Sequence, residues 1–423
     1  MTTVLTNIRP IDDQLSEFHA LIAGTCLART DLVPAARDAD VVLDGRGKIA
    51  TPGFVNAHTH LPMVLLRGLA EDVPLRTWLE TIVWPIERRM SPADVYQCTL
   101  LGLAESIRAG VTCVCDMYFA THEIARAVEE AGLRAVLSYG IVADSLDNGG
   151  REELAKTAEL LEQWNGAAGG RIRVAVAPHS VYTVGQDVWE KAIQLADDHG
   201  ALIHTHLCET RAEVEEWKQK TGETPIATLN RIGAFSVPLL AAHCVHVDPS
   251  DIEILAQHNV RVAHCPKSNA KLGSGIAPVA AMLDAGIPVA IGTDGAASNN
   301  RLDVLEETRF ACFLQRAAAE EPTALPARDA LRLAIENGRT AVGLSDVPFA
   351  DHSPADVVLI GTDSVHAVPS DDPAATLMYA SASTDVADVV VDGTLLMRDG
   401  ELLTIDEEKA KQDVKSLRRR ITD

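Results

Sequence analysis

Two histidines separated by one residue end the first strong strand-like run of the chain. His58 and His60 close an apolar stretch that begins at the Pro52-Gly53 turn. Side chains two apart on a strand share a face, so both imidazoles can point to one spot. Such a pair is a natural half of a metal site. The alternative is an ordinary pair of hydrogen-bonded polar residues at a strand end.

More side chains that can bind a metal follow the later predicted strands. These residues are His179, His204, His206, His243, His246 and Asp294. Each could be an isolated loop residue, but polar residues at five strand ends favour one shared site around a common axis. Histidine nitrogens plus one carboxylate suit a zinc-like divalent ion with a position left for water. Such an ion lowers the pKa of bound water from about 16 towards 7, which indicates metal-assisted hydrolysis.

Hydrolysis of this kind also needs a group that moves protons, and Glu209 is the candidate. It lies three residues beyond His206. The alternative is a solvated carboxylate in the first turn of a helix. The metal context favours the catalytic interpretation.

The elements that must position these residues alternate between strands and helices from Pro52 onward. Strands are expected at Gly53–His58, Val111–Asp116, Ala135–Gly140, Ile172–Pro178, Leu202–Leu207, Leu239–His243, Arg261–His264 and Val289–Thr293. Amphipathic helices are expected at Pro92–Ala109, Glu123–Ala131, Glu152–Trp164, Asp187–His199, Pro249–His258, Pro278–Ala285 and Ala327–Val342. This alternation predicts an α/β fold, a (β/α)8 TIM-like barrel with its chemistry on the loops after the strands.

Strand-rich sequence precedes and follows the predicted barrel. The runs are Ala20–Ile22 and Val41–Leu43 at the start, and Ala355–Ile360, Val386–Val391 and Leu395–Met397 near the end. We therefore expect a small β-sandwich domain formed by both chain ends. The expected limits are 1–52 plus 352–403 for this domain, 53–351 for the metal-dependent barrel and 404–423 for a C-terminal helix.

Composition excludes several classes of partner. The formal charge of −23 over 423 residues argues against nucleic acid, whose phosphates demand a basic surface, and against anionic membranes. A membrane span of about 18 apolar residues and a signal peptide are both absent from the sequence pattern. The eight cysteines are scattered, as expected for reduced core thiols. We expect a cytoplasmic globular protein that acts on a small molecule, with a homo-oligomer left open.

Four stretches together resemble the amidohydrolase superfamily, and specifically its mononuclear aminohydrolase branch. They are Asn56–His60, His204–Glu209, Ala242–Cys244 and Gly292–Asp294. The resemblance implies that the metal is held by His58, His60, His206 and Asp294. It also implies that His243 orients the hydrolytic water, whereas His204 packs or supports. Binuclear relatives carry a bridging lysine on a middle strand, and no lysine lies between Lys156 and Lys191, so one divalent ion, Zn²⁺, is expected.

Further stretches are similar to the 5′-methylthioadenosine/S-adenosylhomocysteine deaminase family. They are Leu65–Asp72, Trp84–Glu87, Asp116–Phe119, Pro266–Gly275 and Gly295–Asn300. The resemblance implies that Glu87 holds the ribose hydroxyls and that His179 contacts the purine. It also implies that Glu209 shuttles protons to the ring and that Ser298 lies near the base. The alternatives are a surface carboxylate for Glu87, a buried structural histidine for His179 and a helix N-cap for Ser298.

One position departs from the family pattern. In that pattern two arginines grip the homocysteine carboxylate, and here one matches Arg151 while the other position holds Tyr139. A single guanidinium with a phenol is a poorer carboxylate site than two guanidinium groups. The departure favours substrates without that tail, such as 5′-methylthioadenosine, 5′-deoxyadenosine or adenosine, over S-adenosylhomocysteine. Arg151 could equally be a solvated residue at a helix start.

The predicted function is therefore hydrolytic deamination of a 5′-substituted adenosine. Activated water attacks C6 of the purine, Glu209 gives a proton to N1, Asp294 and His243 relay the proton of the water, and ammonia leaves. One alternative is another heterocycle on the same scaffold, such as aminodeoxyfutalosine, guanine or a chlorotriazine. Triazine dechlorinases tend to lack a glutamate at position 209, so Glu209 favours deamination. A catalytically silent barrel is the alternative from another class.

Overall fold

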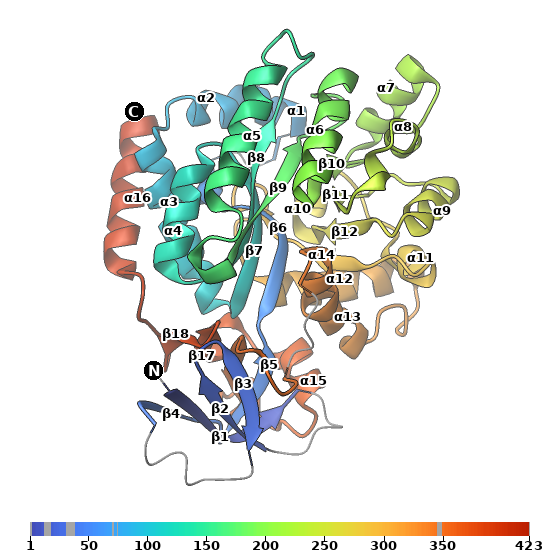
Figure 1. Cartoon of the computed structure of the whole chain (residues 1–423). Coiled ribbons are helices and arrows are strands. Elements are labelled where there is room, and N and C mark those ends of the chain that lie inside the picture. Colours follow the sequence, from blue (N-terminus) through green and yellow to red (C-terminus); the bar gives the residue numbers. More distant parts are fainter. Residues whose placement is uncertain are drawn as a thin grey trace.

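The computed structural model describes residues 2–11, 18–30, 39–69, 72–73, 75–344 and 349–422. Ala70 and Glu71, within one of the stretches that resemble the deaminases, and Met1 and Asp423, at the outer limits of the predicted domains, lie outside the described residues. The fold consists of a barrel surrounded by helices and a smaller sheet beside one end of the barrel (Figure 1). Strands from both ends of the chain lie together in the smaller sheet.

The barrel is one parallel sheet whose strand order follows the sequence. Its strands are β6 (Phe54–His60), β7 (Val111–Tyr118), β8 (Arg134–Ile141), β9 (Ile172–Pro178), β10 (Ile203–Leu207), β11 (Leu239–His243), β12 (Arg261–His264), β13 (Val289–Ile291) and β14 (Asp294–Gly295). Each strand pairs with the next from β6 to β13, and β14 pairs back with β6. The pairing thus returns to its first strand, which confirms the predicted TIM-like barrel.

Small and β-branched residues fill the barrel because its strands are buried on both faces. The inner cluster includes Val55, Ala57, Cys113, Ala175 and Ala263. Gly53, just before β6, is required by close packing, because a Cβ there would lie 2.0 Å from Thr112 Oγ1.

The amide of Asn56 ties the first strand to the last. Its Nδ2 donates to Thr293 Oγ1 at 2.7 Å, and its Oδ1 accepts from Thr293 N at 3.0 Å. Asn56 lies on β6, and Thr293 lies in the short link between β13 and β14. These side-chain bonds therefore reinforce the pairing of β14 with β6.

Helices cover the outside of the barrel. The structure contains α1 (Leu75–Trp78), α2 (Trp84–Glu87), α3 (Pro92–Arg108), α4 (Thr121–Ala131), α5 (Gly150–Trp164), α6 (Gln186–His199), α7 (Arg211–Thr221), α8 (Pro225–Arg231), α9 (Pro249–Gln257), α10 (Pro266–Lys271), α11 (Val279–Asp284), α12 (Val304–Ala319), α13 (Ala327–Ala334), α14 (Glu336–Ala341), α15 (Pro373–Ala375) and α16 (Glu407–Thr422). Short 3₁₀ segments lie at Leu61–Leu66, Ala168–Gly170, Ala234–Ser236 and Ser383–Asp385, and π segments at Leu79–Val83 and Thr376–Ala380.

Two of the helical regions that differ from the sequence-based expectation bear on how the barrel closes. The helix expected at Ala327–Val342 is broken at Ile335, whose φ of −113° and ψ of −85° lie outside the helical region and separate α13 from α14. The long helix α12 was not predicted, although Asp303 caps it by accepting from Glu306 N. Its buried face, including Leu305 and Ala311, follows the helical period.

The smaller sheet combines N-terminal and C-terminal strands in the order β15-β3-β2-β1-β5-β16-β17-β18-β19, with β4 on β1. Its strands are β1 (Thr2–Pro10), β2 (Phe18–Ala23), β3 (Cys26–Thr30), β4 (Val41–Asp44), β5 (Lys48–Pro52), β15 (Ser353–Pro354), β16 (Val357–Gly361), β17 (Val386–Val391), β18 (Thr394–Arg398) and β19 (Glu401–Leu402). β5 pairs antiparallel with β16, which joins the two ends of the chain. A sandwich arrangement and the predicted domain limits stay predictions.

The last helix, α16, runs beside α3 along the barrel (Figure 1). Arg420 on α16 forms an ion pair with Asp94 on α3 at 2.5 Å. Among the described residues, none of the helices has the length and apolar character needed to span a bilayer.

Candidate active site and metal centre

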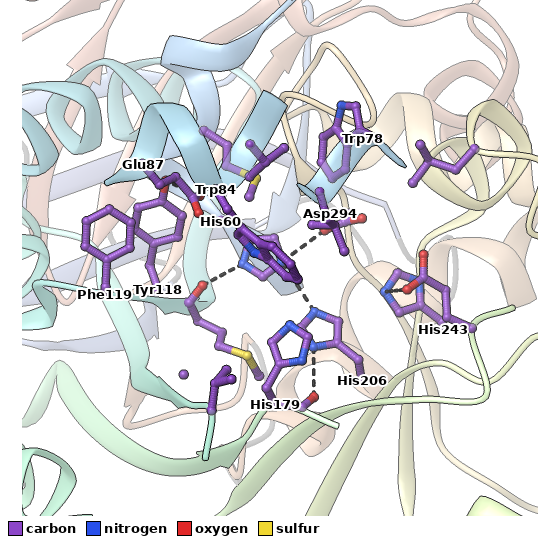
Figure 2. A pocket seen from close by; sticks show the side chains of 18 of the residues that line it. His60, Trp78, Trp84, Glu87, Tyr118, Phe119, His179, His206, His243 and Asp294 are labelled. Atoms are coloured by element: carbon purple, nitrogen blue, oxygen red, sulfur yellow. Dashed lines mark hydrogen bonds and ion pairs between the residues drawn. The ribbon is translucent and has the colours of Figure 1, made fainter. Parts of the chain in front are cut away.

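A cavity of about 190 Å³ opens where the barrel strands end, and it gathers most of the predicted site residues (Figure 2). His60, His179, His206, His243 and Asp294 all line it. Glu209 and Glu87 line it as well. Because the residues come from the ends of five strands or the loops after them, the barrel brings together side chains that are distant in sequence.

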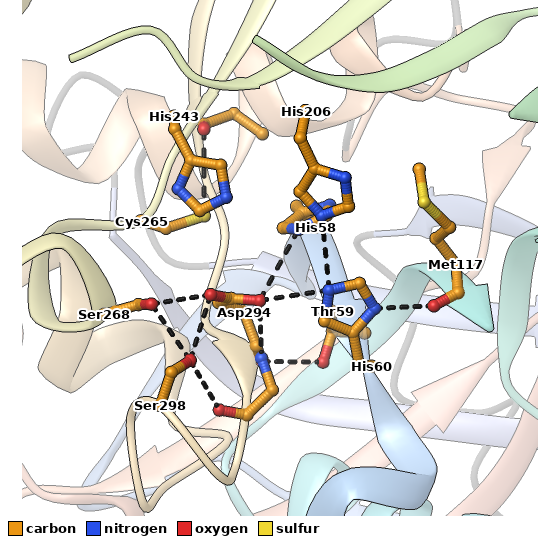
Figure 3. A network of polar contacts seen from close by, with 12 residues as sticks. His58, Thr59, His60, Met117, His206, His243, Cys265, Ser268, Asp294 and Ser298 are labelled. Atoms are coloured by element: carbon orange, nitrogen blue, oxygen red, sulfur yellow. Dashed lines mark hydrogen bonds and ion pairs between the residues drawn. The ribbon is translucent and has the colours of Figure 1, made fainter. Parts of the chain in front are cut away.

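Four side chains, three of them from the cavity lining, converge on one point and could hold a metal ion (Figure 3). The ligand atoms of His58, His60 and His206 all lie within 4.8 Å of one another. Asp294 Oδ1 lies 3.2 Å from His60 Nε2 and 3.6 Å from His58 Nε2. Three imidazoles and one carboxylate form a donor set typical of a zinc-like ion.

Hydrogen bonds on the outer ring nitrogens turn the inner nitrogens toward this point. His60 Nδ1 donates to the Met117 carbonyl, and His206 Nδ1 donates to the His179 carbonyl at 3.0 Å. In its neutral form each ring then has Nε2 as the acceptor nitrogen, which is the tautomer that a metal requires. His58 Nε2 is buried, and it has no hydrogen-bond partner within the part of the chain that the structure describes. An unpaired buried acceptor beside a carboxylate fits a bound cation, so the residues present fit a divalent metal site.

His204 supports this cluster from behind. Its Nε2 lies 2.8 Å from His58 Nδ1, so the bond fixes the orientation of the His58 ring. Burial and the neighbouring His58 lower the pKa of His204 well below its ordinary value. A neutral supporting imidazole agrees with the packing role that the sequence indicated.

Asp294 is held by its own set of contacts. Its φ of 58° is left-handed, and its Oδ2 accepts from Ser268 Oγ at 2.6 Å and from Ser298 Oγ at 3.0 Å. Ser298 thus contacts Asp294. The alternative for Ser298 was a helix N-cap, but the N-cap of the helix that follows, α12, is Asp303. The preceding Gly292 passes so close to His58 that a Cβ would lie 2.9 Å from the His58 Cβ.

Glu209 and His243 lie close to each other in the cavity lining. Glu209 Oε2 lies 3.9 Å from His243 Nε2, and His243 Nδ1 lies 2.8 Å from Asn269 Oδ1. Burial raises the pKa of Glu209 above its ordinary value. A carboxyl group with a raised pKa keeps its proton to higher pH than an ordinary glutamate, which suits a general acid.

Glu87, at the end of α2, binds the hydroxyl of a buried tyrosine. Tyr118 OH donates to Glu87 Oε1 at 2.6 Å. Burial raises the pKa of Glu87 to about 7. The carboxylate lines the cavity, so it differs from the solvated surface residue that was the alternative interpretation.

Three predicted substrate-binding residues are not part of the described cavity lining: Arg151, Tyr139 and Ser298, which contacts Asp294 instead. The Arg151 side chain is 72% exposed and pairs with Asp147 at 3.2 Å. Tyr139 OH donates to Glu153 Oε1 at 3.1 Å, and Lys156 binds the same carboxylate oxygen at 2.9 Å. The role of these three residues in substrate binding stays a prediction.

Sequence reasoning missed the apolar wall of the cavity. Trp78, Trp84, Phe119, Tyr182 and Leu272 line it beside the polar groups. Four of the five could be found by their neighbourhood: Trp84, Phe119 and Leu272 lie in stretches that resemble the deaminases, and Tyr182 follows His179 by three residues. Only the folded chain brings Trp78 to the same wall. Asn269 and Ser268 also lacked an assigned role.

Comparison with known proteins agrees with this geometry. A model of the amidohydrolase family matches residues 49–396. A 5-methylthioadenosine/S-adenosylhomocysteine deaminase from Pelotomaculum thermopropionicum is 45% identical over 368 residues, covering 87% of this chain and 84% of that protein. A 5′-deoxyadenosine deaminase from Methanothermobacter thermautotrophicus is 43% identical over 374 residues, covering 88% of this chain and 87% of that protein.

A solved structure of similar fold also carries a metal. The crystal structure of an adenosine deaminase from Xanthomonas campestris with bound zinc superposes with a TM-score of 0.92 at 32% sequence identity, covering 100% of this chain and 98% of that chain. The family model, the relatives and this structure all span most of the chain, so the chain belongs to the amidohydrolase family.

Proposed function

We propose that this protein is a metal-dependent hydrolytic deaminase of 5′-substituted adenosines. The reaction adds water at C6 of the purine and releases ammonia, which leaves the corresponding inosine. The names of the relatives, a 5-methylthioadenosine/S-adenosylhomocysteine deaminase and a 5′-deoxyadenosine deaminase, support this substrate class. The observation that carries the proposal is that Glu209 and His243 line the same cavity as His60, His206 and Asp294.

In this proposal His58, His60, His206 and Asp294 hold one divalent ion. The donor set and the zinc in a similar adenosine deaminase support Zn²⁺. When bound, such an ion would supply water of lowered pKa at the cavity floor.

The proton transfers belong to three side chains. Glu209, whose pKa burial raises, gives a proton to N1 of the purine as water adds at C6. His243, oriented by Asn269, and Asp294, oriented by Ser268, accept the proton of the water. The same proton then passes to the departing amino group, while the proton left on the new C6 hydroxyl group returns to Glu209, so that ammonia leaves and the carbonyl forms. These roles follow general acid and base catalysis.

Substrate binding is assigned to Glu87 and His179. Glu87 lines the cavity beside Trp84, and in this proposal its carboxylate accepts from the ribose hydroxyls. Burial lowers the pKa of His179 to about 4, so its imidazole is neutral and can bond a purine nitrogen. His179 Nδ1 lies 3.1 Å from Thr183 Oγ1, which limits its rotation. Ser298 acts through Asp294, and Arg151 with Tyr139 would meet the 5′ tail.

We also propose the domain limits expected from sequence: 1–52 plus 352–403, 53–351 and 404–423. Antiparallel pairing of β5 with β16 supports a β unit built from both chain ends.

A panel of substrates scored by ammonia release tests the proposed function. It includes 5′-methylthioadenosine, 5′-deoxyadenosine, adenosine and S-adenosylhomocysteine, with aminodeoxyfutalosine, guanine and a chlorotriazine as the other heterocycles. The adenosines should be deaminated, and Glu209→Gln should lower kcat by roughly 10²–10⁴ while the metal stays bound. Preference for guanine or a triazine would overturn the substrate class, and more than half of the wild-type kcat in the variant would overturn the role of Glu209.

A further inference from the structure

Glu209 enters the cavity from a strained turn between β10 and α7. β10 ends at Leu207 and α7 begins at Arg211. Cys208 has a φ of 52°, a left-handed conformation that costs energy for a residue with a side chain. A turn of this kind persists only when neighbouring groups hold it.

The carboxylate of Glu213 spans this turn. Its Oε1 accepts from Cys208 N at 3.1 Å and its Oε2 accepts from Glu209 N at 2.8 Å. In an ordinary capping box the third helical residue bonds the amide of the cap residue itself. Here the cap is Thr210, which accepts from Glu213 N, and the Glu213 side chain reaches past it to two earlier amides.

The carbonyl side of the same turn is tied to the loop that carries His243. Cys208 O accepts from Val245 N and from His246 N, both at 3.0 Å. Glu213 therefore holds the backbone N–H groups of the turn, and the loop that carries His243 holds its backbone carbonyl group. Together these bonds set the position of Glu209 relative to His243.

We infer that Glu213 is a positioning residue that holds the backbone of Cys208 and Glu209 so that the Glu209 carboxyl group faces the substrate. The inference rests on the proposed catalytic role of Glu209. Glu213 is not in the described lining of the cavity, so it acts through Glu209 and does not touch the substrate. Its carboxylate is suited to this task because two backbone amides can each bond one oxygen.

Glu213→Gln tests the inference, with Glu215→Gln as the matched control on the exposed face of the same helix. A glutamine offers one acceptor oxygen, and its amino group would face the other backbone amide as a second donor. Misplacement of a catalytic group by about 1 Å can cost roughly 10²-fold, so kcat should fall about 10- to 100-fold. KM, metal content and the thermal midpoint should stay near those of the control.

A double-mutant cycle separates positioning from general damage. In a Glu209→Gln background, Glu213→Gln should change kcat by less than about twofold, because residues that act as a unit are non-additive. Glu213→Asp, which keeps the charge but is too short to reach both amides, should resemble Glu213→Gln in the wild-type background. It provides the same comparison if the glutamine variant does not fold.

Equal losses in the two backgrounds would overturn the inference, as would wild-type kcat in both position-213 variants. A fully active Glu209→Gln protein would instead refute the proposed function of Glu209, so the two failures can be told apart.

Discussion

Removal of the Tyr118 hydroxyl should weaken binding of the ribose without disturbing the chemistry at the purine. The hydroxyl donates to Glu87 Oε1 at 2.6 Å, and the tyrosine is buried. A hydrogen bond to a charged group contributes about 1.5–3 kcal/mol, which is roughly 10- to 150-fold in binding. We expect the lower end, about a tenfold rise in KM for Tyr118→Phe, because water in the cavity can partly replace the lost donor.

Tyr118→Phe should also shift the pH dependence of stability, because it changes the pKa of Glu87. Burial raises the pKa of Glu87 from 4.5 to about 7, and the bond from Tyr118 lowers it, so the variant should have a higher pKa still. For a carboxyl group whose folded pKa is raised, the stabilising contribution is fully present below the unfolded value and is lost as pH rises through the folded value. Stability should therefore decline between pH 4.5 and about 7 in the wild type, and this decline should extend to higher pH in Tyr118→Phe.

The assay compares 5′-methylthioadenosine with its 2′,3′-dideoxy analogue. KM for the diol should rise in Tyr118→Phe, whereas KM for the analogue should change less than about twofold, because the group that Glu87 binds is absent. Tyr96→Phe is the matched control, since Tyr96 also donates to a glutamate, Glu130, but on the exposed surface. An equal rise in KM for both substrates would refute this role and would leave Tyr118 as a packing residue stacked against Phe119.

Two further predictions concern the metal and the 5′ substituent. His206→Ala should lose both bound metal and ammonia release, because the remaining donors of the cluster are two histidines and Asp294; two tightly bound ions per wild-type chain by elemental analysis would contradict a mononuclear site. Methylthioadenosine should exceed S-adenosylhomocysteine in kcat/KM by roughly ten- to a hundredfold, because no lysine or arginine belongs to the described cavity lining. Tyr139→Arg should narrow this gap, and a wild-type preference for the carboxylated substrate would show that another residue supplies the charge.

The barrel and the metal cluster could be predicted because they depend on local patterns. Apolar runs separated by amphipathic stretches gave the strands, and residues at strand ends in a parallel barrel must converge. The break at Ile335 could not be predicted in this way, because it lies within an otherwise helical sequence pattern. The position of Arg151 outside the described cavity lining could not be predicted either. Sequence similarity identifies the matching residue but not the direction of its side chain.

Glu213 shows the same limit within the candidate site. Its sequence position is that of an ordinary first-turn acid of α7. Only the left-handed backbone at Cys208 brings two amides within reach of its carboxylate. Sequence patterns indicate which residues share a helix or strand, whereas this contact depends on the backbone conformation of the turn before α7.

The pairing of β14 with β6, reinforced by Asn56 and Thr293, has a consequence for how the protein folds. His60 lies on β6 and Asp294 lies on β14. The two side chains can therefore come together only after the whole barrel has been synthesised and has closed. Contacts between such distant segments form slowly because the loop between them must first be closed. Newly made chains should therefore pass through compact forms that lack a complete site. An Asn56→Ala chain should regain activity later during refolding than it regains its far-UV circular dichroism, with a wider delay than in the wild type.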